Sequence, residues 1–421
     1  MARDASQQIV DYNLRFSGRD PDLLPFKLRK MAAHPFAFFR GTFHLFAADW
    51  ISGLCAPWRD GRGREVDPVL GDAHIESFGA HEAEDGTIAF TLQDLDEAAE
   101  ADFDLDVFRA AASAALAVDQ AGSPLGAACT AAARLAQGYA DQAVRFASGA
   151  DGPDWRVTET EHAPPPVQAL CRRVASVSRV AMLADACEPA PAPGPRRLRR
   201  GERQIDLRPE RARAVLEALG PYLKAKIRGG PAYLPVDVAY RVSGTGGLGR
   251  HRYTVLLSPE VRTPDAEVLL EVKESSPAAL DLYRGRTQAD QAERVVRRTA
   301  EAQGRPNRWL GSCRIGSQPY QVREIGPHDG HLTPPALTDS AEADAVFETC
   351  GRLLAAAHER SFRAAPAGRG CEAPAARLQG REGLWLRRAV SFGLFYAAVV
   401  QEDHRAFTAH IEEALARLVA G

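Results

Sequence analysis

The sequence has few of the features that assign a chain to a specialised class. Its seven cysteines are scattered, odd in number and never form a Cys-x-x-Cys pair, which argues against a zinc site and a disulfide scaffold. Basic residues do not exceed acidic ones, and the net charge of −3 predicts no nucleic-acid partner. Neither a Gly-x-Ser-x-Gly elbow nor a His-Glu-x-x-His motif occurs, so serine and zinc hydrolases have little support.

Long apolar runs are also missing. The N-terminal text MARDASQQIVDYN carries acids and polar residues where a signal peptide needs a basic start and an apolar run. The longest apolar run, Ala389 to Val400, is too short to span a bilayer. With a composition that is 45% hydrophobic and 25% charged, the chain is expected to be a globular cytoplasmic protein in a reducing compartment, without a membrane partner.

The character of the sequence changes twice along its 421 residues. Residues 1–200 are expected to form a helical lobe that carries acidic loops. Residues 201–330 contain the strand-like runs VAYRV, RYTVLL, VLLEV and YQVREI around one helical segment, which indicates a small β-rich lobe. Residues 331–421 are again helical and are expected to complete the first lobe.

A glycine-rich stretch in the β-rich part gives the first sign of a ligand site. Gly244, Gly246 and Gly249 form a Gly-x-Gly-x-x-Gly pattern, which on its own often marks only a tight turn. A dinucleotide fold needs a helix straight after the glycines, whereas RYTVLL is typical of a strand. Strand, glycine loop and strand is the order that covers ATP in protein kinases, so we expect these glycines to bind nucleotide.

That interpretation requires a lysine on the next strand and a helical carboxylate to hold it. Lys273, in VLLEVKE, is in the required place and would neutralise the nucleotide phosphates. Glu293, in the following helical segment, is the first candidate for its partner, and Glu301 is the second.

A second group of motifs lies far upstream, in GDAHIES and QDLDEA. Together they resemble the catalytic loop His-Gly-Asp-x-His-x-x-Asn and the later Asp-x-Asp of small-molecule phosphotransferases of the aminoglycoside and choline kinase type. The resemblance implies that Asp72 orients and deprotonates an acceptor hydroxyl and that Asp94, with Asp96, holds magnesium. Asp106 is similar to an aspartate that braces the loop in those enzymes.

Two positions depart from the pattern of those enzymes. Leu70 stands where a histidine is usual, and Ser77 stands where a metal-binding asparagine is usual. A serine hydroxyl can ligate magnesium but is shorter than the amide, so weak or lost activity is one possible outcome. His74 is a catalytic-loop residue that either ligates metal or braces the loop, and Arg40 either contacts phosphate or packs on aromatic rings.

The catalytic loop comes before the glycine loop, the reverse of the kinase order, and circular permutation accounts for this. The chain also resembles, over nearly its whole length, a bacterial family known as domain of unknown function 2252. The stretches that carry this resemblance are HPFAFFRGTFHLFAADW, GDAHIESFG, QDLDEA, EVKESSPAALDLY, ERVV, YQVREI and LLAAAHERS. The family name implies no activity, so the functional hypothesis rests on the kinase-like motifs.

The sequence therefore predicts an α+β, protein-kinase-like, two-lobed fold in circularly permuted order, with a helical lobe and a small antiparallel β lobe. It predicts an ATP- and Mg²⁺-dependent phosphotransferase that acts on a hydroxyl of a small-molecule acceptor. Three alternatives remain open: a non-catalytic nucleotide-binding protein, an AMP transferase, and a dinuclear metal centre built from Asp72, His74, Asp94 and Asp96. Neither the acceptor nor the oligomeric state follows from the sequence.

Overall fold

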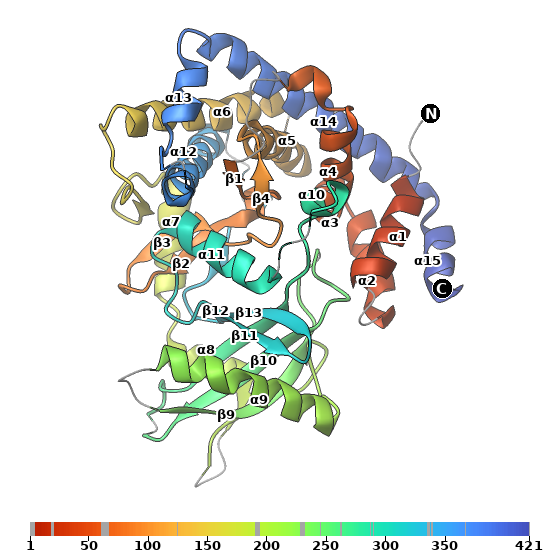
Figure 1. The fold of residues 1–421 in the computed structure, drawn as a ribbon, viewed down its shortest axis with the longest axis vertical. Helices are drawn as coiled ribbons and strands as arrows, with labels where there is room; N and C mark the ends of the chain where they lie inside the picture. The colour runs from red at the N-terminus through yellow and green to blue at the C-terminus, as the bar shows by residue number, and fades with distance from the viewer. Residues whose placement is uncertain are drawn as a thin grey trace.

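A computed structural model describes the chain over residues 5–17, 21–59, 67–123, 125–189, 194–227, 232–244, 246–261, 263–286, 288, 290–334, 337, 340–366 and 368–420. Helices gather in one part of the molecule and the largest sheet lies in the other (Figure 1). All strand pairs are antiparallel within the described residues. The α+β class expected from the sequence is confirmed.

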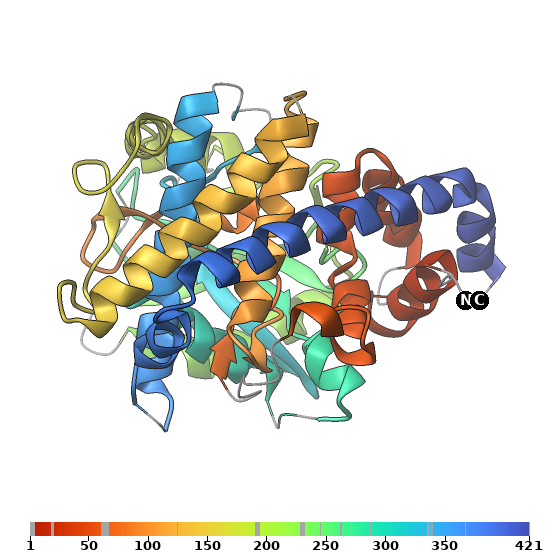
Figure 2. The same cartoon turned by 90° about the horizontal axis from the view of Figure 1, so that it is seen from above.

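Long helices that pack side by side form the body of the helical part (Figure 2). Helix α5 is alanine-rich and almost entirely buried, and the carboxylates of Asp104 and Asp106 in its first turn suit the positive end of the helix dipole. The helices of this body are α5 (Asp104–Gln120), α6 (Leu125–Ala147), α7 (Pro165–Ala175), α12 (Ser340–Ala364), α13 (Glu372–Leu378) and α14 (Glu382–Ala409).

An N-terminal group of helices extends from this body and carries both chain ends. Helix α15 contacts both α1 and α2, so the two ends of the described chain lie close together (Figures 1 and 2). The elements of this group are α1 (Ala5–Ser17), η1 (Pro21–Leu23), α2 (Leu24–Ala32), α3 (Pro35–Gly41), α4 (Phe43–Ser52), η2 (Ala56–Trp58) and α15 (Ile411–Ala420).

Short strands hold the loops that carry the acidic motifs. The hairpin of β2 and β3 separates the GDAHIES loop from the QDLDEA loop, and a two-stranded pair brings the two loops back together. The sheet orders are β14-β2-β3-β5 and β1-β4. The elements are β1 (Asp67–Val69), η3 (Ile75–Ser77), β2 (Phe78–Glu82), β3 (Ile88–Leu92), β4 (Ala99–Ala101), β5 (Val157–Thr158) and β14 (Gly330–His331).

The β-rich part is built on a six-stranded sheet in the order β12-β13-β11-β10-β9-β8. Its strands include the four runs expected from the sequence, which are β9, β10, β11 and β13. The strands are β8 (Gln204–Ile205), β9 (Tyr233–Arg241), β10 (Arg252–Pro259), β11 (Val268–Glu274), β12 (Gly311–Ile315) and β13 (Gln318–Glu324). Between β11 and β12 the chain forms α10 (Ala279–Tyr283) and α11 (Gln291–Gln303).

Both faces of this sheet are covered, which explains why the central strands are almost wholly buried. Val255 and Leu257 of β10 point to a core shared with α9 (Pro209–Lys226), and Leu256 points to a core shared with α8 (Arg179–Ala186) and the pair β6 (Cys187–Glu188) and β7 (Arg197–Leu198). This alternation is the period of two of a β-strand. The expectation of a single helix in this lobe is wrong, because α9 packs on the sheet in addition to α11. Charged residues make up much of the α9 segment, so the helical spacing of its buried Val215, Leu219 and Leu223 is a weak signal in the sequence.

Helix α14 is longer than the apolar run that it contains. The run from Ala389 to Val400 is part of a helix of 28 residues, the one helix in the described chain that is long and apolar enough to cross a membrane. Its side chains Trp385, Phe392 and Tyr396 are buried against the neighbouring helices. The described contacts of α14 are those of a core helix that packs along α5 and α6.

Candidate functional site

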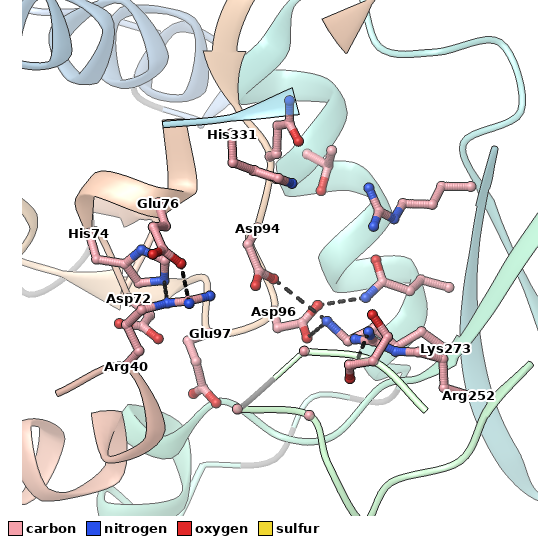
Figure 3. A pocket seen from close by; sticks show the side chains of 18 of the residues that line it. Arg40, Asp72, His74, Glu76, Asp94, Asp96, Glu97, Arg252, Lys273 and His331 are labelled. Carbon is pink, nitrogen blue, oxygen red and sulfur yellow. Dashed lines mark hydrogen bonds and ion pairs between the residues drawn. The ribbon is translucent and has the colours of Figure 1, made fainter. Parts of the chain in front are cut away.

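A cavity of about 380 Å³ lies where the helical part meets the six-stranded sheet. Residues from both motif groups line it (Figure 3). Among the predicted site residues, those on its wall are Asp72, His74, Asp94, Asp96, Gly244, Gly246 and Lys273. In the described part of the chain, the wall does not include Ser77, Gly249 or Glu293. Segments that are far apart in sequence therefore meet in one place.

Helix α5 holds the loop that carries Asp72. The Asp106 carboxylate accepts hydrogen bonds from the backbone N–H groups of Leu70 (2.6 Å) and Gly71 (2.8 Å), which confirms its expected bracing role. Two turns further along α5, Ser113 Oγ accepts the N–H of Ile75 at 2.9 Å. Gly71 has φ of +85°, and a Cβ there would lie 2.2 Å from the carbonyl oxygen of Glu97, so only glycine fits.

His358 contributes to the same brace from α12. Its Nε2 lies 2.9 Å from Asp106 Oδ2, and its Nδ1 lies 2.9 Å from the hydroxyl of Tyr139. It hydrogen-bonds the aspartate that supports the loop, so its role goes beyond packing within the helical part. Leu70 has no polar side-chain group to brace the loop, and His358 from α12 supplies a polar group close by.

Arg109 is a site residue that the sequence analysis missed. Its guanidinium, which is fully buried, contacts Asp72 Oδ1 through Nη2 and through Nε at 2.8 Å. It also lies over the rings of Phe39, Phe43 and Phe46, with the guanidinium carbon 3.9 to 4.8 Å from their centroids. Burial raises the pKa of Asp72, and Arg109 acts against that rise. Arg109 stands three residues after Asp106, which places both on one face of α5.

His74, Glu76 and Arg40 form a polar group beside Asp72, across the cavity from Lys273 and Arg252 (Figure 3). Arg40 pairs with Glu76, and Arg40 Nε lies 3.5 Å from His74 Nε2. Burial, together with Arg40 and Arg109, lowers the pKa of His74 well below its usual value, so the imidazole is neutral near pH 7. The geometry favours a bracing role for His74 and brings Arg40 into the cavity wall.

Ser77 faces the loop and not the cavity. Its hydroxyl donates to the carbonyl oxygen of Asp72 at 3.3 Å and accepts the N–H of His74 at 3.4 Å. Its side chain is buried. These contacts do not fit the proposed role of Ser77 as a magnesium ligand, because the hydroxyl is used to close the turn that presents Asp72.

Asp94 and Asp96 extend from the second acidic loop toward Lys273. Lys273 Nζ pairs with Asp96 Oδ2 and lies 3.6 Å from Asp94 Oδ1. Lys273 lowers the pKa of Asp94 against the effect of burial, and about half of the Asp94 side chain is exposed to the cavity. Gln321 Nε2 donates to Asp96 at 2.5 Å. Magnesium in phosphotransferases is commonly held by one or two carboxylates plus phosphate oxygens, and this pair fits that pattern.

A metal site made by the protein alone is not present in the described residues. No group of three or more His, Cys, Asp or Glu side chains among them is arranged to hold a metal ion. The dinuclear centre considered for Asp72, His74, Asp94 and Asp96 therefore lacks structural support. Any metal bound to Asp94 and Asp96 would need ligands from a bound molecule or water.

Helix α11 approaches the site with an arginine in place of the expected glutamate. Glu293 is exposed, and Glu301 pairs with Arg298 (2.8 Å), so Lys273 has aspartate partners instead. Arg294 is buried and donates to the carbonyl oxygens of Asp96 (2.8 Å), Ser276 (2.9 Å) and Ala98 (2.5 Å). Arg294 of α11 thus positions the acidic loop by holding the backbone carbonyl groups of that loop.

The glycine loop connects β9 to β10 and closes one side of the cavity. Gly244 and Gly249 have φ of +80° and +85°, which glycine adopts without strain. A Cβ at Gly247 would lie 3.2 Å from Arg252 Nη2 and 3.6 Å from Lys273 Cε. Arg252 and Lys273 are direct partners across β10 and β11, so the loop lies against two cations.

A buried carboxylate keeps the cations of this wall in place. Glu271 is 2% exposed and faces Arg323 (2.8 Å), Arg241 (3.3 Å) and Arg252 (3.6 Å). Burial alone would raise the pKa of Glu271, but the three arginines outweigh it and hold the pKa well below its usual value. Arg252 and Arg323 also line the cavity, so Glu271 holds two positive charges at its wall.

Comparisons with known proteins identify a family and no specific relative. Comparison with curated proteins and with solved structures found no match. A family model described as "Uncharacterized protein conserved in bacteria (DUF2252)" matches residues 19–410, a range that includes every residue of the cavity wall except Tyr12. The family resemblance noted in the sequence is thereby confirmed, and the chain belongs to the DUF2252 family.

Proposed function

We propose that the protein is an ATP- and magnesium-dependent phosphotransferase that acts on a hydroxyl of a small-molecule acceptor. The observation that carries the proposal is the content of a single cavity. One wall has a glycine loop and Lys273, and the other has Asp72 and the Asp94–Asp96 pair. A phosphate-binding cation, a metal-binding carboxylate pair and an aspartate near the acceptor are the recurrent parts of phosphoryl-transfer sites.

The topology of the six-stranded sheet supports the nucleotide half of the proposal. The glycine loop joins β9 to β10, Lys273 lies on β11, and helix α11 comes before β12 and β13. In protein kinases, likewise, the glycine loop precedes a strand that carries the lysine, and a helix that can pair with this lysine follows. The sheet order β12-β13-β11-β10-β9-β8 places Lys273 on β11, one of the two central strands, beneath the loop.

The arrangement of α12 and β1 supports the permuted order. Helix α12 contacts β1, although the two elements stand near opposite ends of the chain. The LLAAAHERS segment of α12 supplies His358 to the brace of the Asp72 loop. A chain that ran directly from α12 into β1 would have the kinase order, so the proposed permutation moves one connection and leaves the packing as it is.

The proposed reaction assigns a task to each group. The acceptor oxygen forms a bond to the γ-phosphorus, the bond from that phosphorus to the β,γ-bridging oxygen breaks, and ADP leaves. Asp72 accepts a hydrogen bond from the acceptor hydroxyl and takes its proton. Asp94 and Asp96 would hold magnesium, which when bound neutralises charge on the phosphate oxygens. Lys273 then exchanges its contact with Asp96 for the phosphates.

Thermal unfolding with ATP and magnesium tests the nucleotide site. Ligand at about one hundred times its dissociation constant adds roughly 2.7 kcal/mol, a visible shift in midpoint. The expected result is a magnesium-dependent shift in the wild type that is absent in Lys273→Met and retained in Lys224→Met, a change of an exposed lysine on α9. Each variant is compared with its own ligand-free midpoint. No shift in the wild type would overturn the proposal.

A non-catalytic nucleotide-binding protein is the second candidate, and two contacts favour it. Ser77 faces away from the cavity, so the third metal ligand of the kinase pattern is missing, and Arg109 occupies Asp72 Oδ1. The two functions differ in turnover. Slow ADP release from ATP that is lost in Asp72→Asn, with nucleotide binding preserved, supports the phosphotransferase. Binding without turnover supports the second candidate, and pyrophosphate release would indicate AMP transfer.

A further inference from the structure

Lys27 is a cation that reaches the cavity from outside the β-rich part. It lies on α2 in the N-terminal helices, is 2% exposed, and lines the cavity together with Lys273. Its Nζ donates to the carbonyl oxygen of Gly246 at 2.7 Å. The glycine loop is thus contacted by an ammonium group from the helical side of the molecule.

The two lysines lie near neighbouring residues of the same turn of chain. Lys27 contacts the carbonyl of Gly246, whereas the next residue, Gly247, lies against Lys273 and Arg252. Because both lysines line the cavity, a phosphate chain bound at Lys273 lies in the same space as the Lys27 ammonium group. The helical wall also carries Asp72, where the acceptor is expected.

The surroundings of Lys27 suit an anionic ligand. Burial and the nearby Arg250 lower the pKa of Lys27 to about 7, and Glu97 acts in the opposite direction. A nearby anion raises the pKa of a lysine, as Glu97 does here. A phosphate group beside Lys27 would add to this effect and favour the ammonium form.

We propose that Lys27 binds the terminal phosphate of the nucleotide and stabilises the charge on the phosphoryl group as it is transferred. The inference rests on the proposed function and adds a residue to it. Cations that reach over a transferring phosphoryl group from a separate element have this effect in other phosphotransferases. Lys27 forms no covalent bond in the step: ADP still leaves and the acceptor proton still goes to Asp72.

Lys30 offers a matched control on the same helix. Its Nζ donates to the carbonyl of Gly244 in the same loop, at 3.2 Å, but the residue is outside the cavity wall. Lys30→Met therefore removes a loop contact and a positive charge without removing the proposed phosphate contact.

Titration calorimetry of the full chain with ATP and with ADP, both with magnesium, tests the inference. Lys27→Met and Lys27→Gln are expected to weaken ATP binding about tenfold more than ADP binding, a factor equivalent to about 1.4 kcal/mol. Lys30→Met should leave the ratio of the two affinities unchanged. An equal loss for both nucleotides, or no loss, in the Lys27 variants would overturn the role of Lys27 while leaving the nucleotide site intact. A wild type that binds neither nucleotide would instead overturn the proposed function.

A crystal structure of the wild type with a non-hydrolysable ATP analogue gives a result that does not depend on how the variants fold. Lys27 Nζ is expected within hydrogen-bond distance of a γ-phosphate oxygen. A γ-phosphate that is bound elsewhere in the cavity, with Lys27 still on Gly246, would contradict the inference.

Discussion

Arg109 donates to Asp72 through Nε at 2.8 Å from a side chain that has no exposed surface. The aspartate that stands in the catalytic position is therefore held by a buried charge, and its carboxylate has one oxygen directed into that pair. The remaining oxygen, Oδ2, is the atom that can meet an acceptor hydroxyl. This pair determines how Asp72 is aimed and how it ionises.

Replacing Arg109 by methionine is expected to lower the free energy of unfolding by about 3–5 kcal/mol near pH 7, because it leaves a buried carboxylate without its partner. Burial already raises the pKa of Asp72, and loss of the guanidinium raises it further. A carboxyl group with a raised folded-state pKa opposes folding increasingly as the pH rises through that pKa. The deficit should shrink toward pH 4 in urea unfolding, and Asp72→Asn in the Arg109→Met background should recover part of it. A deficit that does not change with pH would contradict this account.

Replacing Glu271, in the β-rich part, is expected to change the free energy of unfolding with the opposite pH dependence. Its pKa is held well below the usual value by three arginines that outweigh burial, so its contribution to stability is present above about pH 4.5 and is lost as the pH falls through the lowered folded-state pKa. Glu271→Gln should cost about 3–5 kcal/mol at pH 7, and less at pH 2 to 3. Glu260→Gln, at an exposed position, is the control and should cost less than about 0.5 kcal/mol. Equal losses at both pH values would argue against the ionised cluster.

The brace of the Asp72 loop can be tested at single backbone amides. The two carboxylate oxygens of Asp106 each accept one backbone N–H, from Leu70 and Gly71. Asp106→Asn replaces one of these acceptors by an NH₂ group and should destabilise the protein by about 2–4 kcal/mol. Hydrogen exchange should become faster at these two amides. Ser113→Ala is the matched change at the other end of the loop and should affect the amide of Ile75 instead. Faster exchange at Ile75 alone in Asp106→Asn would contradict the assignment.

The magnesium dependence of nucleotide binding tests whether Asp94 or Ser77 is a metal ligand. If Asp94 ligates the metal, Asp94→Asn should weaken the affinity for magnesium about tenfold. The ATP-induced thermal shift of this variant should then need a higher magnesium concentration. Ser77→Ala should keep the wild-type effect of magnesium on this shift, since the hydroxyl lies in the loop and not in the cavity. It should lower stability by about 1–3 kcal/mol through the lost hydrogen bonds. Loss of the magnesium effect in Ser77→Ala would restore serine as a ligand.

Much of this site followed from local sequence patterns, and the parts that did not follow have a physical reason. The glycine loop, Lys273 and Asp106 were recognisable because each has a short motif on a fixed type of element. Arg109 and Lys27 had no such signal, because their partners Asp72 and Gly246 lie far away in the chain and are brought close only by packing.

The helical periodicity of α11 argues against Glu293 as the partner of Lys273. The buried side chains of α11 include Ala292, Val295, Thr299 and Ala302, which repeat at helical spacing. Glu293 lies off that face, whereas Arg294 borders it on the side toward the acidic loop. The phase of the helix therefore predicts that the arginine meets the acidic loop. The kinase pattern predicts a carboxylate instead, and the carboxylate at this point of the helix is exposed.

The three contacts that α5 makes with the Asp72 loop, through Asp106, Arg109 and Ser113, have a consequence for motion. They repeat along one face of a buried helix, so we expect the Asp72 loop to keep its place relative to α5 when a ligand binds. Any adjustment of the cavity wall is then expected in the glycine loop and at Lys273, which have no contact with α5 of this kind among the described residues.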